Sequence, residues 1–166
     1  MEGEQNIREK NGEHPFGDTG QLILLAVFLI VWVSDSFFFR ASTFLSVHVP
    51  LYMRLIIFGL ALITAVYLSM SGHVVVSHEQ RPVDVVSTGA FKYVRHPLYL
   101  ASILSYLGLT VSTASLISFA LLVVIFAFYS YIAGYEEKLL EKNYGEAYRE
   151  YKRKTGKWVP RIGRGS

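Results

Sequence analysis

The chain has 166 residues, of which 52% are hydrophobic and 17% are charged, and its formal net charge is +3. Charged residues make up about a quarter of an ordinary soluble domain, so this composition, with its apolar residues gathered in long runs, argues against a soluble globular protein. The sequence contains no cysteine, which excludes disulfides, thiolate metal ligands and a cysteine nucleophile. The length suits one domain.

The first 20 residues are polar and net acidic, and they lack a basic start that leads into an apolar core. This pattern is not typical of a secretory signal peptide. We expect residues 1–20 to form a polar tail and residues 21–166 to form a single transmembrane domain.

Apolar runs predict an all-α integral membrane helical bundle. Residues 21–39 contain one charge, residues 55–71 contain none, and residues 98–135 contain none over 38 positions. A helix crosses a bilayer with about 20 apolar residues, so the last run suits two helices joined by a turn in the polar stretch 110–118. The expected spans are 21–39, 51–71, 97–112 and 115–133.

Asp35 is an ionisable side chain inside the first predicted span. Carboxylates in such positions are often functional. Asp35 is nevertheless remote in sequence from the other polar groups, so we expect a structural role in which it pairs with Arg40 or Arg54.

The distribution of lysine and arginine predicts the orientation in the membrane. Four spans place both tails and the second loop on one side, which then carries 14 of the 16 Lys and Arg residues. Because cytoplasmic loops are enriched in these residues, we expect a multi-pass protein with cytoplasmic N- and C-termini.

The second loop, residues 72–97, is unusually polar for a membrane bundle. It carries His73, His78 and His96, and Gly89 suits a turn. Arg81 precedes a proline and should be extended. Pro97 fits the first turn of the third span, where its missing N–H costs nothing. The N–H groups of that helix start would then offer an anion site.

Two polar motifs flank the predicted helical hairpin. The first, Arg95-His96-Pro97-Leu98-Tyr99, has a simple interpretation in which Arg95 extends to lipid headgroups and Tyr99 joins an aromatic belt. The second, Glu136-Glu137, can be a solvated helix start. Both motifs lie at the same predicted depth and side, so their cation and carboxylates can instead pair, or together hold a zwitterionic ligand.

The segment 134–154 has the pattern of an amphipathic helix on the membrane surface. Apolar and aromatic residues recur at three- and four-residue intervals, and Gly145 predicts an interruption or bend. The basic run 152–157 suits anionic headgroups, which explains it better than nucleic acid does. The recurring positions are Leu139, Leu140, Tyr144, Ala147, Tyr148 and Tyr151.

The sequence lacks the motifs of metal sites, phosphate-binding loops and serine hydrolases. His73 and His78 are five residues apart, and the stretch that follows is not a His-Glu-x-x-His helix, so we expect no metal. The sequence shows neither a glycine-rich phosphate loop nor an ordered Ser-His-Asp set.

The order of motifs resembles that of a known family. Thr88-Gly89-Ala90-Phe91 is followed by Arg95-His96-Pro97-x-Tyr99 and a hairpin, and then by Glu136-Glu137, Tyr144-Gly145-Glu146-x-Tyr148 and Val159-Pro160-Arg161. Over residues 73–161 the chain resembles integral-membrane methyltransferases of the isoprenylcysteine carboxyl methyltransferase type, which are related to phospholipid methyltransferases.

The resemblance implies S-adenosylmethionine as methyl donor and S-adenosylhomocysteine as product. It also implies catalytic roles for Arg95, His96 and Glu137, and it assigns the cofactor site at the cytosolic end to matching positions: His73, Tyr93, Val94, Arg95, His96, Tyr99, Glu136 and Glu137. Two departures stand out, because Val76 replaces a frequent glutamine and residues 132–135 lack a frequent arginine. The methionine carboxylate would then rely on Arg95 or on N–H groups of the helix that begins at Pro97.

The resemblance leaves the methyl acceptor open. An isoprenylcysteine-like carboxylate is favoured, and a phospholipid amine or a small thiol are alternatives. A carboxylate or thiolate needs no general base, whereas an amine would need His96 or Glu137. Two other functions remain as alternatives: an NADPH-dependent reductase of the sterol reductase type, and a non-catalytic scaffold that binds anionic lipid.

Overall fold

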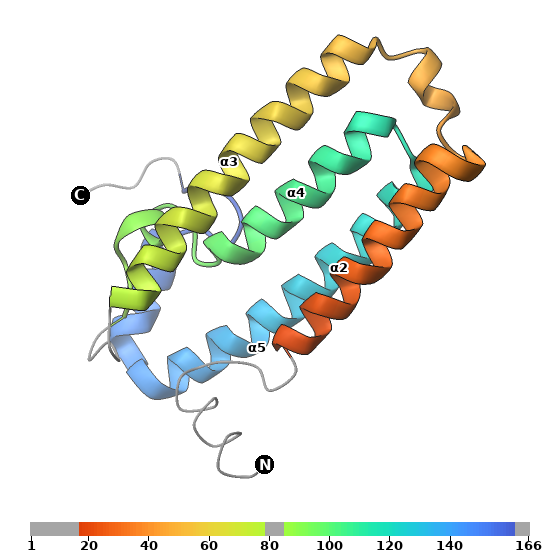
Figure 1. Cartoon of the computed structure of the whole chain (residues 1–166). Helices are drawn as coiled ribbons and strands as arrows, with labels where there is room; N and C mark the ends of the chain where they lie inside the picture. Colours follow the sequence, from red (N-terminus) through yellow and green to blue (C-terminus); the bar gives the residue numbers. More distant parts are fainter. Residues whose placement is uncertain (1–16, 79–84, 162–166) are drawn as a thin grey trace. The chain divides into compact units, whose positions relative to one another are not determined.

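The structure is a computed structural model that describes residues 17–78 and 85–161 (Figure 1). The expectations for residues 1–16 and for the extended Arg81 lie outside the described residues. The chain is all-α, as expected, and its helices are α2 (Gly17–Val33), the π-helical η1 (Ser34–Phe39), the 3-10 helix η2 (Phe44–Val47), α3 (Leu51–His78), the 3-10 helix η3 (Gly89–Lys92), α4 (Pro97–Thr113) and α5 (Leu116–Lys154).

In the described part of the chain, three helical segments are long and apolar enough to cross a membrane: Thr19–Phe39, Leu51–His73 and α5. The fourth apolar helix, α4, has 17 residues. At about 1.5 Å per residue it is about 25 Å long, which is at the short end of what a bilayer requires. The chain is therefore an all-α membrane helical bundle.

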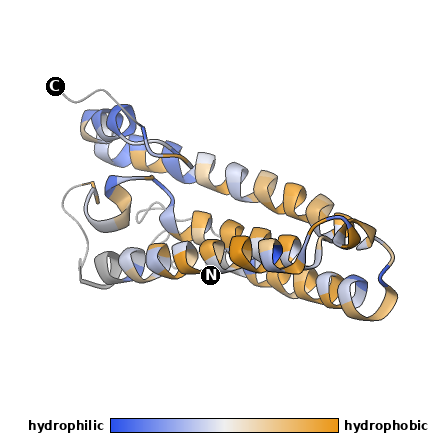
Figure 2. Cartoon of the chain, turned by 90° about the horizontal axis from the view of Figure 1, so that it is seen from above, coloured by the Kyte–Doolittle hydropathy of each residue, from blue (hydrophilic) through white to orange (hydrophobic). Residues whose placement is uncertain are grey.

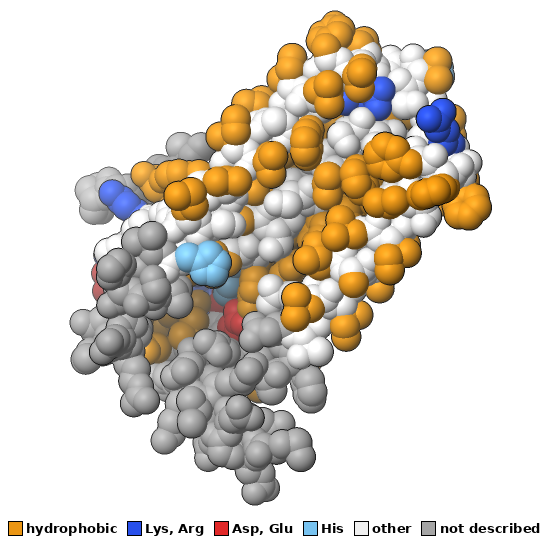
Figure 3. All heavy atoms as spheres, viewed as in Figure 1, with side chains coloured by type: hydrophobic (Ala, Val, Ile, Leu, Met, Phe, Trp, Pro, Cys, Tyr) orange, Lys and Arg blue, Asp and Glu red, His pale blue; other side chains and the backbone are white. Residues whose placement is uncertain are grey.

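The outer surfaces of α2 and α3 are apolar and exposed. Within their most apolar windows only 17% and 11% of the residues, respectively, are buried, and Phe39 is 78% exposed. Figure 3 shows hydrophobic side chains covering one face of these helices. Exposed apolar surface on this scale marks contact with an apolar environment, which here is lipid.

Two predicted breaks in the helices are confirmed. The turn between α4 and α5 lies in the polar stretch, where Ala114 has φ 54°. Gly145 has φ 55° and ψ −125°, which kinks α5. Residues 116–154 otherwise form one helix of 39 residues, which continues through Gly134 from the predicted fourth span into the segment that follows it.

The chain divides into two compact units. Unit 1 comprises Met1–Gly17, Tyr67–Leu100 and Ser130–Ser166, and unit 2 comprises Asp18–Val66 and Ala101–Tyr129. Hydrophilic residues gather in the C-terminal part of α5 (Figure 2), which belongs to unit 1. Every side chain that the sequence assigns to the cofactor site lies in unit 1 as well.

Within unit 2, Asp35 is buried in a cluster of hydroxyl groups. It accepts hydrogen bonds from the backbone N–H of Ser42 at 3.0 Å, from the Ser42 hydroxyl at 2.5 Å and from the Ser115 hydroxyl at 2.5 Å. Ser118 continues the network through Ser115, at 2.8 Å. Asp35 is thus satisfied by neutral donors.

The predicted pairing of Asp35 with Arg40 or Arg54 is wrong. Arg54 donates instead to the carbonyls of Val49 at 3.1 Å and Ser112 at 2.7 Å. Arg40 adopts a left-handed conformation with φ 48° at the end of η1. The chain reverses direction there, which brings the amide of Ser42 back to Asp35. The carboxylate is therefore hydrogen-bonded by neutral donors and is not paired with a cation.

Candidate functional site

The loop before α4 is built by one glycine turn and one proline. Gly89 has φ 57°, a conformation that glycine adopts without strain, and it starts η3 as the predicted turn. The Tyr151 hydroxyl donates to the carbonyl of Phe91 at 2.7 Å, which ties this loop to α5. Helix α4 begins at Pro97, as predicted. The polar motif is therefore held immediately before α4.

The chain returns to this loop after α5 ends. The N–H of Arg95 donates to the carbonyl of Gly156 at 2.9 Å, and Val94 and Gly156 form an isolated parallel bridge. A Cβ atom at Gly156 would lie 1.8 Å from the carbonyl oxygen of Val159, so the turn there accepts only glycine. This turn holds Lys157 and Trp158 beside the polar motif.

Arg95 forms a buried ion pair with Glu137. Its Nε lies 3.0 Å from Glu137 Oε1, and each side chain is 8% exposed. One terminal nitrogen also donates to the carbonyls of Lys152 at 3.2 Å and Thr155 at 2.6 Å. Arg95 therefore does not extend to lipid headgroups. It joins the start of α4 to the middle and the end of α5.

His96 lies between the two carboxylates of the Glu pair. Its Nε2 is 3.2 Å from Glu137 Oε1, and its Nδ1 is 3.7 Å from Glu136 Oε2. Tyr99 stacks on the imidazole with ring centroids 5.6 Å apart, and its hydroxyl donates to Glu136 Oε1 at 2.5 Å. The motif before α4 and the Glu pair of α5 thus form one cluster, as the sequence indicated.

The surroundings fix the charge of this cluster. Burial alone would raise the pKa of the Glu137 carboxyl, but hydrogen bonds from His96 and Arg95 outweigh it and lower this pKa to about 2. Burial lowers the pKa of His96, while Glu137 acts against that shift. At neutral pH Glu137 is ionised and His96 is neutral. The Nε2–H then donates to Glu137 and leaves a lone pair on Nδ1.

Lys157 and Trp158 also reach this cluster, although no sequence motif pointed to them. The Lys157 ammonium donates to the carbonyl of Ser130 at 3.1 Å and lies 5.8 Å from the centroid of the Trp158 ring. That ring is 5.9 Å from the imidazole of His96. Burial lowers the pKa of Lys157. The only available signal was Gly156, which permits the turn that directs Lys157 toward α5.

The remaining predicted site residues differ in exposure. His73 is exposed near the end of α3, and Tyr93 is 50% exposed. Val94 as a whole residue is 2% exposed, and its N–H donates to the carbonyl of Ala90 at 3.3 Å, so neither its side chain nor its backbone is open to solvent. On the face shown in Figure 3, histidine and acidic side chains lie close to each other. Within residues 17–78 and 85–161, no group of three or more histidine, aspartate or glutamate side chains could hold a metal.

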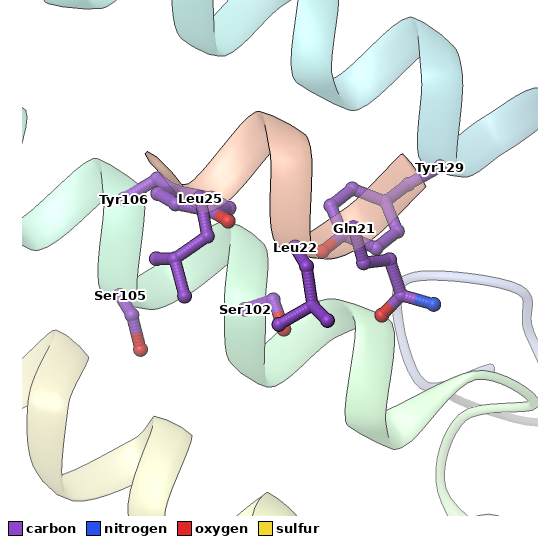
Figure 4. Close-up of a pocket in the computed structure, with 7 residues that line it drawn as sticks. All are labelled: Gln21, Leu22, Leu25, Ser102, Ser105, Tyr106 and Tyr129. Atoms are coloured by element: carbon purple, nitrogen blue, oxygen red, sulfur yellow. The ribbon is translucent and has the colours of Figure 1, made fainter. Parts of the chain in front are cut away.

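Unit 2 contains a separate pocket of about 300 Å³ (Figure 4). Residues of α2, α4 and α5 line it, and most of the lining is apolar with a few hydroxyl groups. The lining residues are Gln21, Leu22, Leu25, Ser102, Ser105, Tyr106 and Tyr129.

Comparison with known proteins agrees with these features. The family model described as phospholipid methyltransferase matches residues 47–147. A methanethiol S-methyltransferase from Crocosphaera subtropica is 30% identical over 92% of this chain and 55% of its own length. A protein-S-isoprenylcysteine O-methyltransferase from Schizosaccharomyces pombe is 30% identical over 54% of this chain and 39% of its own.

A third relative has a different kind of name. The nickel-cobalt-cadmium resistance protein NccN from Alcaligenes xylosoxydans xylosoxydans is 32% identical over 50% of this chain and 39% of its own length. The chain thus spans about half, or less, of the length of these curated relatives. No solved structure matches. Because the family match covers more than half of the sequence and includes the Arg95–Glu137 cluster, the chain belongs to the phospholipid methyltransferase family.

Proposed function

We propose that this protein transfers a methyl group from S-adenosylmethionine to an acceptor at the cytoplasmic face of a membrane. The observation that carries the proposal is the buried cluster of Arg95, His96 and Glu137, in which groups 41 and 42 residues apart meet within 3.2 Å. Family membership and the apolar helices support the reaction class and the membrane setting.

The side chains of the cluster fit the charges of this cofactor. S-adenosylmethionine carries a sulfonium, an amine and a carboxylate. Glu136 and Glu137 offer negative charge to the two cationic groups, and the rings of Tyr99 and Trp158 offer aromatic faces, which attract cations. His73 and Tyr93, which are more exposed than Val94, complete the proposed cofactor site. When bound, the cofactor supplies an activated methyl group.

The residues of the cluster position the reactants and exclude water. Methyl transfer depends mainly on alignment, and positioning alone can lower a barrier by about 7–11 kcal/mol. Arg95 fixes Glu137 through the ion pair and fixes the end of α5 through two carbonyls. Neutral His96 keeps a lone pair on Nδ1, which lies 3.7 Å from a Glu136 oxygen. This lone pair can accept a proton from a protonated methyl acceptor.

We propose an anionic acceptor, with an isoprenylcysteine-like carboxylate favoured and a small thiol as the alternative. Both are consistent with relatives named for those acceptors, and neither requires a strong base.

Calorimetric titration of the detergent-solubilised protein with S-adenosylhomocysteine tests the proposal. We expect binding by the wild type and loss of binding in Glu137→Gln and His96→Ala. The matched control is Glu141→Gln, since Glu141 lies one turn further along α5 and pairs with Arg149 on the surface at 2.8 Å. Absence of binding by the wild type would contradict the proposal and favour a non-catalytic, lipid-binding scaffold.

The acceptor is identified by a second assay with a radiolabelled methyl donor. Three acceptor classes are compared: a prenyl-thioether carboxylic acid, a short alkyl thiol and a phospholipid amine. We expect label in the carboxylic acid. Label in the thiol alone would assign the chain to the alternative acceptor, and label in the amine alone would contradict the anionic acceptor.

A further inference from the structure

Lys157 is a partly buried cation at the candidate site that makes no direct ion pair, although the more distant carboxylates of Glu137 and Glu136 attract it. Its ammonium donates to a backbone carbonyl, that of Ser130, at 3.1 Å. Among the ion pairs formed within residues 17–78 and 85–161, none involves Lys157. An ammonium has three N–H donors, so Lys157 retains capacity for an anionic partner.

The position of Lys157 depends on Gly156, which permits the tight turn that directs Lys157 toward α5. A Cβ atom at Gly134 would lie 3.7 Å from Lys157 Nζ, which is ordinary van der Waals contact, so the ammonium lies against α5 at this position. The ammonium thus occupies a place beside α5, one turn before the Glu pair.

The other cations of the site already have protein partners. Lys152 Nζ lies 3.7 Å from Glu137 Oε2 and 3.4 Å from Glu141 Oε2. Arg95 pairs with Glu137 at 3.0 Å and donates to the carbonyls of Lys152 and Thr155. Taking Arg95 for a ligand would leave Glu137 buried without its partner, which is costly. His96 is neutral at physiological pH because burial lowers its pKa. A carboxylate that enters this site therefore meets Lys157 as its available positive charge.

We propose that Lys157 binds the carboxylate of a ligand in the methyltransferase site. The assignment rests on the proposed function and replaces the expectation that Arg95 holds the methionine carboxylate. The carboxylate belongs either to the amino-acid part of the cofactor or to the acceptor. The chemistry is the same in both cases: a charge-assisted hydrogen bond from an ammonium to a carboxylate.

Calorimetry with two ligands tests whether the carboxylate belongs to the cofactor. S-adenosylhomocysteine carries the carboxylate, whereas its decarboxylated analogue lacks the carboxylate and keeps the amine. We expect the wild type to prefer S-adenosylhomocysteine by about 10- to 100-fold. Lys157→Gln should abolish this preference by weakening S-adenosylhomocysteine alone, and Lys157→Arg should retain part of it. Lys142→Gln, at an exposed position of α5, is the control and should leave the preference intact.

Steady-state kinetics tests whether the carboxylate belongs to the methyl acceptor. If the acceptor supplies the carboxylate, Lys157→Gln keeps its preference for S-adenosylhomocysteine, and KM for a prenyl-thioether carboxylic acid rises by about 10-fold. Binding of the corresponding amide as an inhibitor then stays unchanged. Either pattern supports the assignment.

Two outcomes overturn the assignment. The first is that Lys157→Gln changes neither the preference nor KM. The second is an equal loss for ligands with and without a carboxylate, which marks a purely structural lysine. Failure of the wild type to bind S-adenosylhomocysteine is a different result, because it overturns the proposed function and with it this assignment.

Discussion

Among the residues that the structure describes, each unit buries one carboxylate, Glu137 in unit 1 and Asp35 in unit 2, and the two are stabilised in different ways. Glu137 of unit 1 lies within 3.2 Å of a guanidinium and an imidazole, and its other oxygen is 3.7 Å from the ammonium of Lys152. Asp35 of unit 2 accepts hydrogen bonds from two serine hydroxyls and one backbone amide. One carboxylate is paired with charge, and the other is solvated by neutral donors.

This difference suggests different roles: Glu137 belongs to the candidate ligand site, and Asp35 is a structural cross-link. The hydroxyls around Asp35 come from the loop after η1 and from the start of α5, so they join segments 73 to 80 residues apart without adding a charge. The groups around Glu137 include a histidine, a tyrosine and a lysine that can also contact a ligand. We expect substitutions at Glu137 to change binding and stability together, and substitutions at Asp35 to change stability alone.

Glu137→Ala should cause the largest effect. It leaves Arg95 and His96 buried without their carboxylate, and removing one partner of a buried ion pair costs about 3–5 kcal/mol. We expect a large fall in the melting temperature and no measurable binding of S-adenosylhomocysteine. Retention of binding would show that Glu137 lies outside the ligand site, even if the variant is destabilised.

Arg95→Lys should have the next largest effect. Lysine keeps the charge but cannot reproduce the geometry of a guanidinium that bonds a carboxylate and two carbonyls, so we expect a loss of about 2 kcal/mol. Hydrogen exchange should quicken at Thr155 and Gly156, which Arg95 holds in place. Unchanged exchange there would contradict this anchoring role.

Asp35→Asn should have a smaller effect that is confined to stability. The amide keeps one acceptor oxygen but turns its NH₂ toward hydroxyls that must then reorient, at a cost of about 1 kcal/mol. Binding of S-adenosylhomocysteine should remain at the wild-type level. A loss of binding comparable to that of Glu137→Ala would remove the distinction between the two carboxylates.

The last prediction concerns the acid dependence of stability. The pKa of Glu137 is about 2 in the folded state, below its ordinary value of 4.5. Folding therefore favours the ionised form, and this contribution is complete above pH 4.5 and is lost as the pH falls toward 2. The difference in melting temperature between wild type and Glu137→Gln should shrink when the pH is lowered from 5 to 3. A constant difference would contradict the pairing.

Much of the fold followed from apolar run lengths and from a few special residues. Pro97, Gly89 and Gly145 each mark a break because their backbone preferences are local and strong. The meeting of Arg95 with Glu137 also followed from sequence, since both flank a helical hairpin whose ends must lie near each other. Such features depend on spacing along the chain.

The incorrect prediction for Asp35 and the missed role of Lys157 both involve reversals of the backbone. The spacing of residues along the chain does not reveal such reversals. Asp35 contacts Ser42 because Arg40 adopts a left-handed conformation. Glycine or asparagine usually marks such a conformation in a sequence, and an arginine does not. Lys157 reaches α5 through a turn at Gly156 that is fixed by a pairing with Val94, 62 positions earlier in the numbering. From sequence alone, Lys157 was one residue of a basic run.

The pairing of Arg95 also bears on how the protein is inserted during synthesis. Arg95 leaves the ribosome before its partners, which follow 42, 57 and 60 residues later. While α4 enters the bilayer, Arg95 is still a full positive charge at its flank and can act as a topological signal. Once the end of α5 arrives, the same charge is buried. One arginine can therefore first orient the hairpin and later hold the folded cluster together.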